Sequence, residues 1–231
     1  MIDNNKILLQ IFQEFKKRLD LGKFVIDKSG VKTVEVIALQ MELNPLHWNL
    51  DLGFKKTNIS YVKKELKWYL SQSRDITGYV DNIAIWKQIC SKDNLVNSNY
   101  GYLIFSNANG NQFDNCFDEL IRNRESRKAT MVYTRPSIHL DAYKDGMSDF
   151  ICTNGVQVLI RDNELIYIVH QRSCDMIYGF FNDFVWHCFV YRKLFRKLRL
   201  LYKDLKVGDL IYNIDSAHIY EKHFKFLENI K

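Results

Sequence analysis

Gln171-Arg172-Ser173-Cys174-Asp175 is the most informative stretch of this 231-residue chain. Gly179 follows it, and the residues after Gly179 place apolar side chains at helical spacing. Asn182 and Asp183 lie at the start of this predicted helix, and Asp183 falls on its apolar face. A carboxylate there is either a helix cap, which favours the helix dipole, or a buried functional group. Spacing alone leaves both interpretations open.

The composition is that of one ordinary globular domain, which we expect to span residues 1–231. Hydrophobic residues make up 47% of the chain and charged residues 26%, and no linker rich in serine, glycine or proline occurs. No apolar run is long enough to cross a membrane, and the N-terminus does not resemble a signal peptide. We therefore expect a cytoplasmic protein. The five cysteines form no CxxC pair, so the sequence indicates no disulfide framework.

The order of predicted helices and strands indicates an α+β fold. We expect helices at residues 5–21, 58–70, 113–121 and 182–203, and a further helix at the C-terminal end. We expect strands at residues 31–43, 129–134, 156–160, 165–169 and 209–215, with a hairpin turn at residues 161–164. Helices and strands mix without strict alternation, which argues against a doubly wound sheet.

Glu65 interrupts the apolar face of one predicted helix. Val62 and Tyr69 define that face, and Glu65 lies three residues after the first and four before the second. Burial disfavours the charged form of a carboxyl group and raises its pKa toward neutrality, which suits proton transfer. The competing interpretation is an ion pair with Lys63 or Lys64 at the edge of the face.

Basic side chains are the candidates for binding an anion. The net charge is +6, and no glycine-rich phosphate loop is present. Any phosphate must therefore be bound by side chains, and the candidates are Lys28, Arg127, Lys128 and Arg172. The basic run at residues 191–201 carries apolar residues at helical spacing. We interpret it as a solvated helix face and do not expect a nucleic-acid partner.

A row of polar residues marks the segment Asp215-Ser216-Ala217-His218-Ile219-Tyr220. An extended backbone would put Ser216, His218 and Tyr220 on one face, where three hydrogen-bonding side chains suit a hydroxyl-bearing ligand. A trio on an edge strand, satisfied by its own neighbours, is the alternative. His218 and His223 are five residues apart and no HExxH pattern occurs, so we expect no metal site.

These motifs, taken in order, resemble the thymidylate synthase family over nearly the whole chain. Five further segments carry the resemblance. Residues 27–33 are similar to the family's N-terminal phosphate loop, residues 65–70 to its general-base helix, and Ile85-Trp86 to its folate-side tryptophan motif. Asn99-Tyr100-Gly101-Tyr102 is similar to the segment beside the family's catalytic cysteine, and Ser126-Arg127-Lys128 to the arm that reaches the partner subunit's phosphate. Counting back from Gln171 through the predicted hairpin matches Cys152 to the family's nucleophile. Periodicity alone does not distinguish Cys152 from the other cysteines.

The resemblance implies a role for individual residues. Cys152 would be the nucleophile, Glu65 the general base, and Asp183 the residue that reads the base. The nucleotide-binding residues would be Lys28, Arg127, Lys128, Arg172, Ser173, Asp183, Tyr100, His218 and Tyr220, and the residues facing folate would be Trp86, Asp175 and Gly179. The resemblance also implies a thymidylate synthase-like fold, a mixed sheet packed with helices. Two copies would pair through this sheet, with Arg127 and Lys128 donated across the interface.

Residue 183 separates two branches of the family. Enzymes that read uracil carry asparagine there, whereas the cytosine-specific branch carries aspartate, as this chain does. That branch is also similar at Tyr133-Thr134-Arg135-Pro136-Ser137, at residues 145–150 and at Cys152-Thr153-Asn154. The likeness implies transfer of a one-carbon unit from methylenetetrahydrofolate to carbon 5 of deoxycytidylate, followed by addition of water. A methyl-forming enzyme acting on deoxycytidylate or deoxyuridylate and a catalytically silent nucleic-acid-binding relative remain as alternatives.

Two departures from the family pattern bear on the site. Lys128 replaces a second arginine, which weakens bidentate binding of phosphate and leaves the choice between ribose and deoxyribose open. The chain ends at Lys231, soon after Tyr220. We therefore expect no long C-terminal segment of the kind that closes over folate in thymidylate synthases. For a viral chain, the expected compartment is the host cytoplasm.

Overall fold

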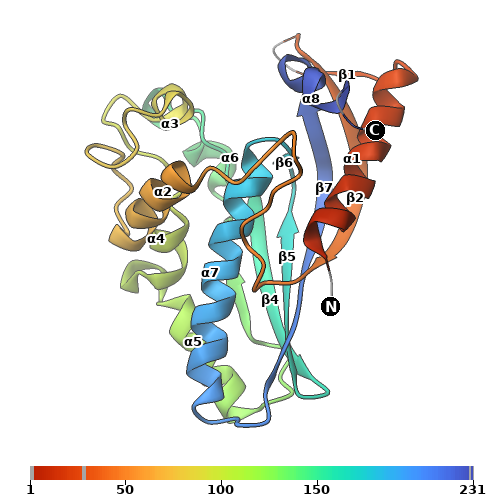
Figure 1. Cartoon of the computed structure of the whole chain (residues 1–231). Coiled ribbons are helices and arrows are strands. Elements are labelled where there is room, and N and C mark those ends of the chain that lie inside the picture. The colour runs from red at the N-terminus through yellow and green to blue at the C-terminus, as the bar shows by residue number, and fades with distance from the viewer. Residues whose placement is uncertain (1–2, 28–29, 229, 231) are drawn as a thin grey trace.

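The computed structural model describes residues 3–27, 30–228 and 230, and a β-sheet runs through its centre (Figure 1). The helices are α1 (Asn4–Asp20), α2 (Ile59–Ser71), α3 (Ala84–Ile89), α4 (Tyr100–Phe105), α5 (Gln112–Arg122), α6 (Ile138–Asp141), α7 (Gly179–Arg199) and α8 (Phe224–Glu228). The strands are β1 (Val25–Ile26), β2 (Lys32–Leu43), β3 (Thr130–Val132), β4 (Thr153–Arg161), β5 (Glu164–Gln171), β6 (Cys174–Asp175) and β7 (Lys206–Tyr220).

The order of the strands explains why distant segments meet. Within the described residues the sheet has seven strands, of which six follow the order β1-β2-β7-β5-β4-β3, and the short β6 pairs with β7. Strand β7 runs parallel to β5 and β6, whereas the other neighbouring pairs are antiparallel. The sheet is therefore mixed, and the predicted α+β class is confirmed. Helix α7 lies across β4 and β5, and α1 lies along β2 (Figure 1).

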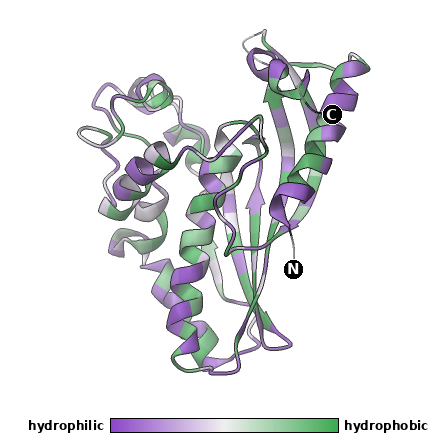
Figure 2. Cartoon of the chain, in the orientation of Figure 1, coloured by the Kyte–Doolittle hydropathy of each residue, from purple (hydrophilic) through white to green (hydrophobic). Residues whose placement is uncertain are grey.

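The hairpin of β4 and β5 carries the most informative residues to one end of the sheet. Buried and half-buried side chains alternate along both strands, and Figure 2 shows the corresponding alternation of hydropathy in the sheet. Asp162 and Asn163 turn the chain with φ angles of 48° and 64°, which Asp and Asn tolerate better than most residues. The turn predicted at residues 161–164 is confirmed. Its register sets Thr153 opposite Gln171.

Helix α7 begins three residues earlier and ends four residues earlier than the predicted range of 182–203. The Asp175 carboxylate accepts the N–H groups of Ile177 and Tyr178, so a capped turn leads directly into the helix. Asp183 is therefore the fifth residue of α7. The helix-cap interpretation of Asp183 is wrong, because that residue lies in the second turn.

Gly101 sets the distance between α2 and α4. A Cβ atom at this position would lie 1.8 Å from the carbonyl oxygen of Tyr69, so any larger residue would push the two helices apart. The close approach lets the ring of Tyr100 stack on that of Tyr69, with centroids 5.3 Å apart. Glycine at this position thus fixes where Tyr100 lies.

The remaining predicted elements differ from the structure mainly in length. The predicted strand at residues 209–215 continues to Tyr220, so the polar row of Ser216, His218 and Tyr220 belongs to one long strand. This strand lies between β2 and β5, so the edge-strand interpretation is wrong. No helix among the described residues is long and apolar enough to span a lipid bilayer.

Candidate active site

Cys152 and Arg172 lie side by side because the hairpin of β4 and β5 pairs the residues next to them. The N–H of Arg172 donates to the carbonyl of Cys152 at 3.0 Å. The guanidinium donates to the carbonyls of Phe150 and Ile151 and lies over the Phe150 ring, 4.5 Å from its centroid. These contacts hold Nη2 of Arg172 at 3.7 Å from the Cys152 sulfur. A fixed cation therefore faces the predicted nucleophile.

Burial nevertheless keeps the Cys152 thiol protonated at neutral pH. It raises the pKa of Cys152 to about 11, while Arg172 lowers this pKa and the charges of Asp183 and Asp149 raise it further. The neutral thiol is thus the resting form. Formation of the thiolate therefore requires either more positive charge near the sulfur or removal of the thiol proton during attack.

Hydrogen bonds connect Asp183 to Thr153, the residue that follows Cys152 in sequence. Nε2 of Gln171 donates to Oδ2 of Asp183 at 2.7 Å and to Oγ1 of Thr153 at 3.3 Å. Thr153, next to Cys152 in sequence, in turn donates to the hydroxyl of Tyr100 at 3.1 Å. Burial raises the pKa of Asp183 to about 7, although the bond from Gln171 lowers it. This carboxyl group is therefore able to hold or release a proton near neutral pH.

Glu65 is buried on α2, which is one of the two interpretations that its spacing left open, and its partner is Tyr61. The Tyr61 hydroxyl donates to Oε1 of Glu65 at 2.7 Å and accepts from the indole N–H of Trp86 at 3.1 Å. Burial raises the pKa of Glu65 to about 8, the bond from Tyr61 lowers it, and the charge of Asp183 raises it. Lys63 and Lys64 are exposed whereas Glu65 is buried, and among the described residues neither lysine forms an ion pair with it, so the ion-pair interpretation of Glu65 is wrong.

A third polar group forms where β6 meets the end of β7. Asp175 pairs with His218 in parallel register, and the His218 ring contacts that of Tyr220 with centroids 5.0 Å apart. Ser216 donates to the Glu35 carboxylate of β2, so it already has a partner within the protein. Burial raises the pKa of Tyr220, and the nearby charges of Asp175 and Cys152 contribute to this shift. His218 and Tyr220 therefore belong to the surroundings of the nucleophile.

Two predicted nucleotide-binding residues lie far from this site within one chain. The carbonyl of Ala129 accepts from the N–H of Val158, so Arg127 and Lys128 lie beside the turn end of β4, opposite residues 159 and 160. Cys152 precedes the other end of β4, roughly 25 Å away at the rise of an extended strand. Both basic side chains are exposed.

The other predicted residues have simpler positions. Ser173 is half-buried in the bend between β5 and β6, and Gly179 is half-buried at the first position of α7. Trp86 is 8% exposed. Lys28 lies outside the described residues.

Gln171 and Tyr61 are site residues whose roles the sequence analysis missed. Gln171 was part of the informative stretch but had no assigned partner. The hairpin register could have identified one, because it sets Gln171 opposite Thr153, beside the nucleophile. Tyr61 precedes Glu65 by four residues, a spacing at which helix side chains meet.

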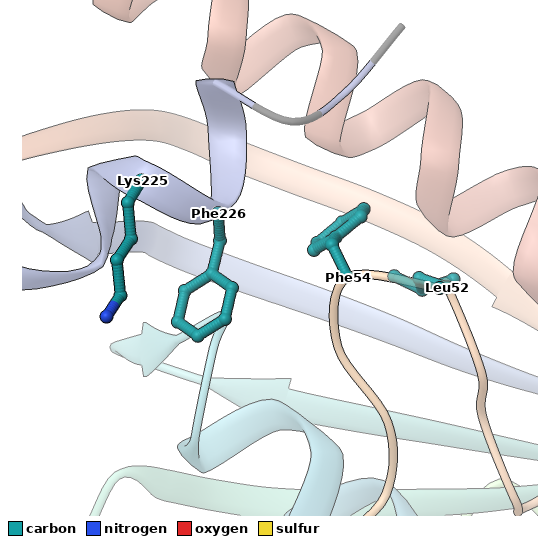
Figure 3. Close-up of a pocket in the computed structure, with 5 residues that line it drawn as sticks. Leu52, Phe54, Lys225 and Phe226 are labelled. Atoms are coloured by element: carbon teal, nitrogen blue, oxygen red, sulfur yellow. The ribbon is translucent and has the colours of Figure 1, made fainter.

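The hollow drawn in Figure 3 is separate from these residues. Leu52, Gly53, Phe54, Lys225 and Phe226 line it, and its volume is about 480 Å³. None of the predicted site residues that the structure describes lines it. In the described part of the chain, no three His, Cys, Asp or Glu side chains gather as a metal ion would require.

Glu65→Gln is expected to stabilise the fold at alkaline pH. The folded chain keeps the Glu65 proton up to a pKa of about 8, whereas the unfolded chain releases it near 4.5. Between these values the folded state binds the extra proton, so Glu65 makes stability fall as pH rises. Glutamine removes this penalty and still accepts from Tyr61. At about pH 9, thermal unfolding should show a higher Tm for the variant, by about 2–4 °C for each kcal/mol gained in the free energy of unfolding. Near about pH 4, the Tm values of variant and wild type should differ little. A lower Tm at the alkaline pH would contradict the buried, protonated state of Glu65.

Comparison with known proteins identifies the family of this chain. The family model described as thymidylate synthase matches residues 10–230. The chain is similar to the deoxycytidylate 5-hydroxymethyltransferases of Enterobacteria phages T4, T2 and T6. Each is 41% identical over an alignment of 223 residues, which covers 92% of this chain and 88% of the relative. The matched region contains the Cys152–Arg172 pair, the Asp183 network and Glu65, and the chain belongs to the thymidylate synthase family.

Proposed function

We propose that this protein is a deoxycytidylate 5-hydroxymethyltransferase. It transfers a one-carbon unit from methylenetetrahydrofolate to carbon 5 of deoxycytidylate and adds water, giving 5-hydroxymethyldeoxycytidylate and tetrahydrofolate. The observation that carries the proposal is a carboxyl group, Asp183, with a pKa near neutrality in the network that includes Thr153, the neighbour of Cys152. The names of the phage relatives support the same activity.

Cys152 would start the reaction. Carbon 5 of cytosine is a poor nucleophile, and attack of the Cys152 sulfur on carbon 6 turns it into an enamine-like centre. Arg172 would stabilise the thiolate, because its guanidinium is already fixed 3.7 Å from the sulfur. Additional positive charge is needed to overcome the effect of burial on the pKa of Cys152.

Asp183 would read the base and stabilise the charge that develops on it. A protonated carboxyl group donates to ring nitrogen 3 of cytosine through one oxygen and accepts from the amino group through the other. Its raised pKa makes this protonated form available near neutral pH. The hydrogen bond to nitrogen 3 strengthens as negative charge moves into the ring during attack.

Glu65 would exchange a proton with water in the site. It is buried and hydrogen-bonded to Tyr61, with a pKa near 8 that suits exchange of a proton with water. After the carbon–carbon bond forms, carbon 5 loses its hydrogen as a proton to a base in the site, and tetrahydrofolate leaves with the electron pair of its bond to the one-carbon unit. Carbon 5 then carries an exocyclic methylene group. Glu65 would position the water that adds to it, and elimination of Cys152 then restores the aromatic ring.

Trp86, Asp175 and Gly179 would form the folate side of the site. A Cβ atom at Gly179 would meet only Asp175, at an ordinary contact distance of 3.7 Å. The protein's own packing therefore does not require glycine there, which supports close approach of a ligand. Methylenetetrahydrofolate supplies the one-carbon unit, and the indole of Trp86 is linked to Glu65 through Tyr61. His218 and Tyr220 would hold the sugar hydroxyl.

The fate of folate tests the proposal against methyl transfer. Addition of water leaves folate as tetrahydrofolate, whereas formation of a methyl group oxidises it to dihydrofolate. Turnover of deoxycytidylate without the absorbance of dihydrofolate is the expected result. Dihydrofolate formed in a one-to-one ratio with product would instead identify a methyl-forming enzyme.

We also propose that two copies share each site. Arg127 and Lys128 lie roughly 25 Å from Cys152 within one chain, too far to bind the phosphate of the same nucleotide. The face of the sheet opposite α7 carries half-buried apolar residues on neighbouring strands, with Leu159 paired to Ile166 and Ile168 paired to Ile211. A second copy covering this face would bring its basic residues toward Cys152.

Mixing two inactive variants tests the shared site. Arg127→Ala and Cys152→Ala chains are each expected to be inactive alone, since one lacks the phosphate contact and the other the nucleophile. Subunit exchange creates one site with both groups intact, so activity should reappear. Mixed chains that remain inactive, although mass spectrometry shows hybrid dimers, would contradict donation of Arg127 across the interface.

The expected compartment follows from the same proposal. An enzyme that acts on free nucleotides would work in the cytoplasm, and for a viral chain in the cytoplasm of the host.

A further inference from the structure

The Gln171 side chain is held in one orientation. It is fully buried, and both N–H groups of Nε2 are directed at the site, one to Asp183 and one to Thr153. Its Oε1 is buried with no hydrogen-bond partner in the part of the chain that the structure describes. Leaving a buried acceptor unpaired is unfavourable. The two donated bonds therefore determine how this amide points.

Reversing the amide would remove its bond to the carboxylate form of Asp183. Oε1 would then face Oδ2 of Asp183, and two acceptors would meet at 2.7 Å unless a proton lay between them. In the observed orientation, Oδ2 already accepts from Gln171. When Asp183 takes up a proton, that proton consequently favours Oδ1, the oxygen that does not accept from Gln171.

The position of this proton is what distinguishes the two bases. A protonated carboxyl group matches cytosine when the oxygen facing ring nitrogen 3 carries the proton. The same group matches uracil when the oxygen facing carbon 4 carries it, because uracil has N–H at position 3 and a carbonyl at position 4. Protonation of Asp183 alone therefore does not select cytosine.

We propose that Gln171 determines the base specificity of this site by keeping Oδ2 of Asp183 as an acceptor and directing the proton to Oδ1. Oδ1 then donates to nitrogen 3 of cytosine, and Oδ2 accepts from the amino group. This inference rests on the proposed function, since it takes deoxycytidylate as the substrate. Gln171 is a positioning residue, because it acts on the base only through Asp183.

The other groups around Asp183 do not select one of its oxygens in this way. The charge of Asp183 acts on Glu65, Tyr61 and Tyr69 of α2, on Tyr100 of α4, and on Tyr133, Cys152, Cys174 and Tyr212. Burial raises the pKa of Asp183 itself, and the hydrogen bond from Gln171 lowers it. The amide is thus the group that makes the two oxygens of Asp183 unequal.

Nucleotide binding by Gln171→Met tests the proposal. Methionine has a similar length but no donor, so either oxygen of Asp183 is then free to carry the proton. The ratio of the Kd for deoxyuridylate to the Kd for deoxycytidylate, measured by calorimetry without folate, should fall about tenfold. Gln112→Met is the control, since that amide joins Leu103 to Val132 and touches no site residue. Its ratio should equal that of the wild type.

Gln171→Glu supplies a second, pH-dependent readout. When protonated, a glutamate at this position donates to Asp183 as the amide does; when ionised, it repels the Asp183 carboxylate. Preference for deoxycytidylate should therefore recover as pH falls. Because the ratio of two Kd values does not depend on how much protein is folded, reduced stability does not obscure the result. An unchanged ratio in Gln171→Met would overturn the proposal. The wild-type protein could also prefer deoxycytidylate in binding and yet form no product. That result would count against the proposed reaction, and the Kd ratios of the variants would still decide the role of Gln171.

Discussion

Cys152→Ala protein should bind deoxycytidylate and convert none of it. The sulfur makes the covalent bond that activates carbon 5, so exchange of the hydrogen on that carbon should disappear together with product formation. Removing a nucleophile of this kind lowers kcat by ~10⁴-fold or more. Release of tritium from carbon 5, measured alongside nucleotide binding, checks the result. The matched control is Cys116→Ala, because burial also raises the pKa of that thiol.

The control separates chemistry from packing. Cys116 and Cys188 are buried core residues, and Cys90 is half-buried outside the site. Replacing any of them with a small apolar residue should change stability by about 0.5–3 kcal/mol and leave tritium release in the folded protein intact. Substantial turnover by Cys152→Ala would rule out covalent activation through this residue.

The second large effect is a change of base in Asp183→Asn. Asparagine donates to the carbonyl of uracil and accepts from its ring N–H when its nitrogen faces carbon 4. Oε1 of Gln171, which has no partner among the described residues, can then turn to accept from that nitrogen. The reversed amide still pairs with cytosine, but it has no acidic proton to pass to nitrogen 3 as charge develops there. A buried mismatch costs about 1–3 kcal/mol per unpaired group, or roughly tenfold to several hundredfold in selectivity. The variant should lose deoxycytidylate turnover and gain relative activity on deoxyuridylate, as kcat/KM for each nucleotide would show.

Asp114→Asn is the control for this substitution. It makes the same chemical change at an ion pair with Lys197, between α5 and α7. Its ratio of activities on the two nucleotides should match the wild type. Full deoxycytidylate turnover by Asp183→Asn would mean that nitrogen 3 needs no proton from residue 183, and the deoxycytidylate assignment would lose its main structural support.

Local patterns in the sequence predicted most elements of the fold. The turn residues Asp162 and Asn163 predict the hairpin, and the helix spacing places Glu65 on the apolar face of α2. The start of α7 was predicted less well, because Asp175 caps the preceding turn through a contact that helical periodicity does not contain. That error left the position of Asp183 ambiguous between cap and buried acid.

Pairings between segments were harder to predict than the segments themselves. Arg172 lies beside Cys152 only because the hairpin register brings them together, and its carbonyl contacts fix the guanidinium there. The bond from Tyr61 to Glu65 replaces the ion pair that the neighbouring lysines favoured, since those lysines face solvent. Helical spacing allowed either partner for Glu65, and burial of its face decided between them.

The product nucleotide tests the central claim most directly. The wild-type protein would be incubated with deoxycytidylate and methylenetetrahydrofolate in water labelled with heavy oxygen, and the nucleotide analysed by mass spectrometry. Addition of water to the exocyclic methylene predicts a product that gains one carbon, two hydrogens and one oxygen, with the heavy isotope in the new hydroxyl group. A product that gains only a methyl group, or deoxycytidylate returned unchanged, would contradict the account.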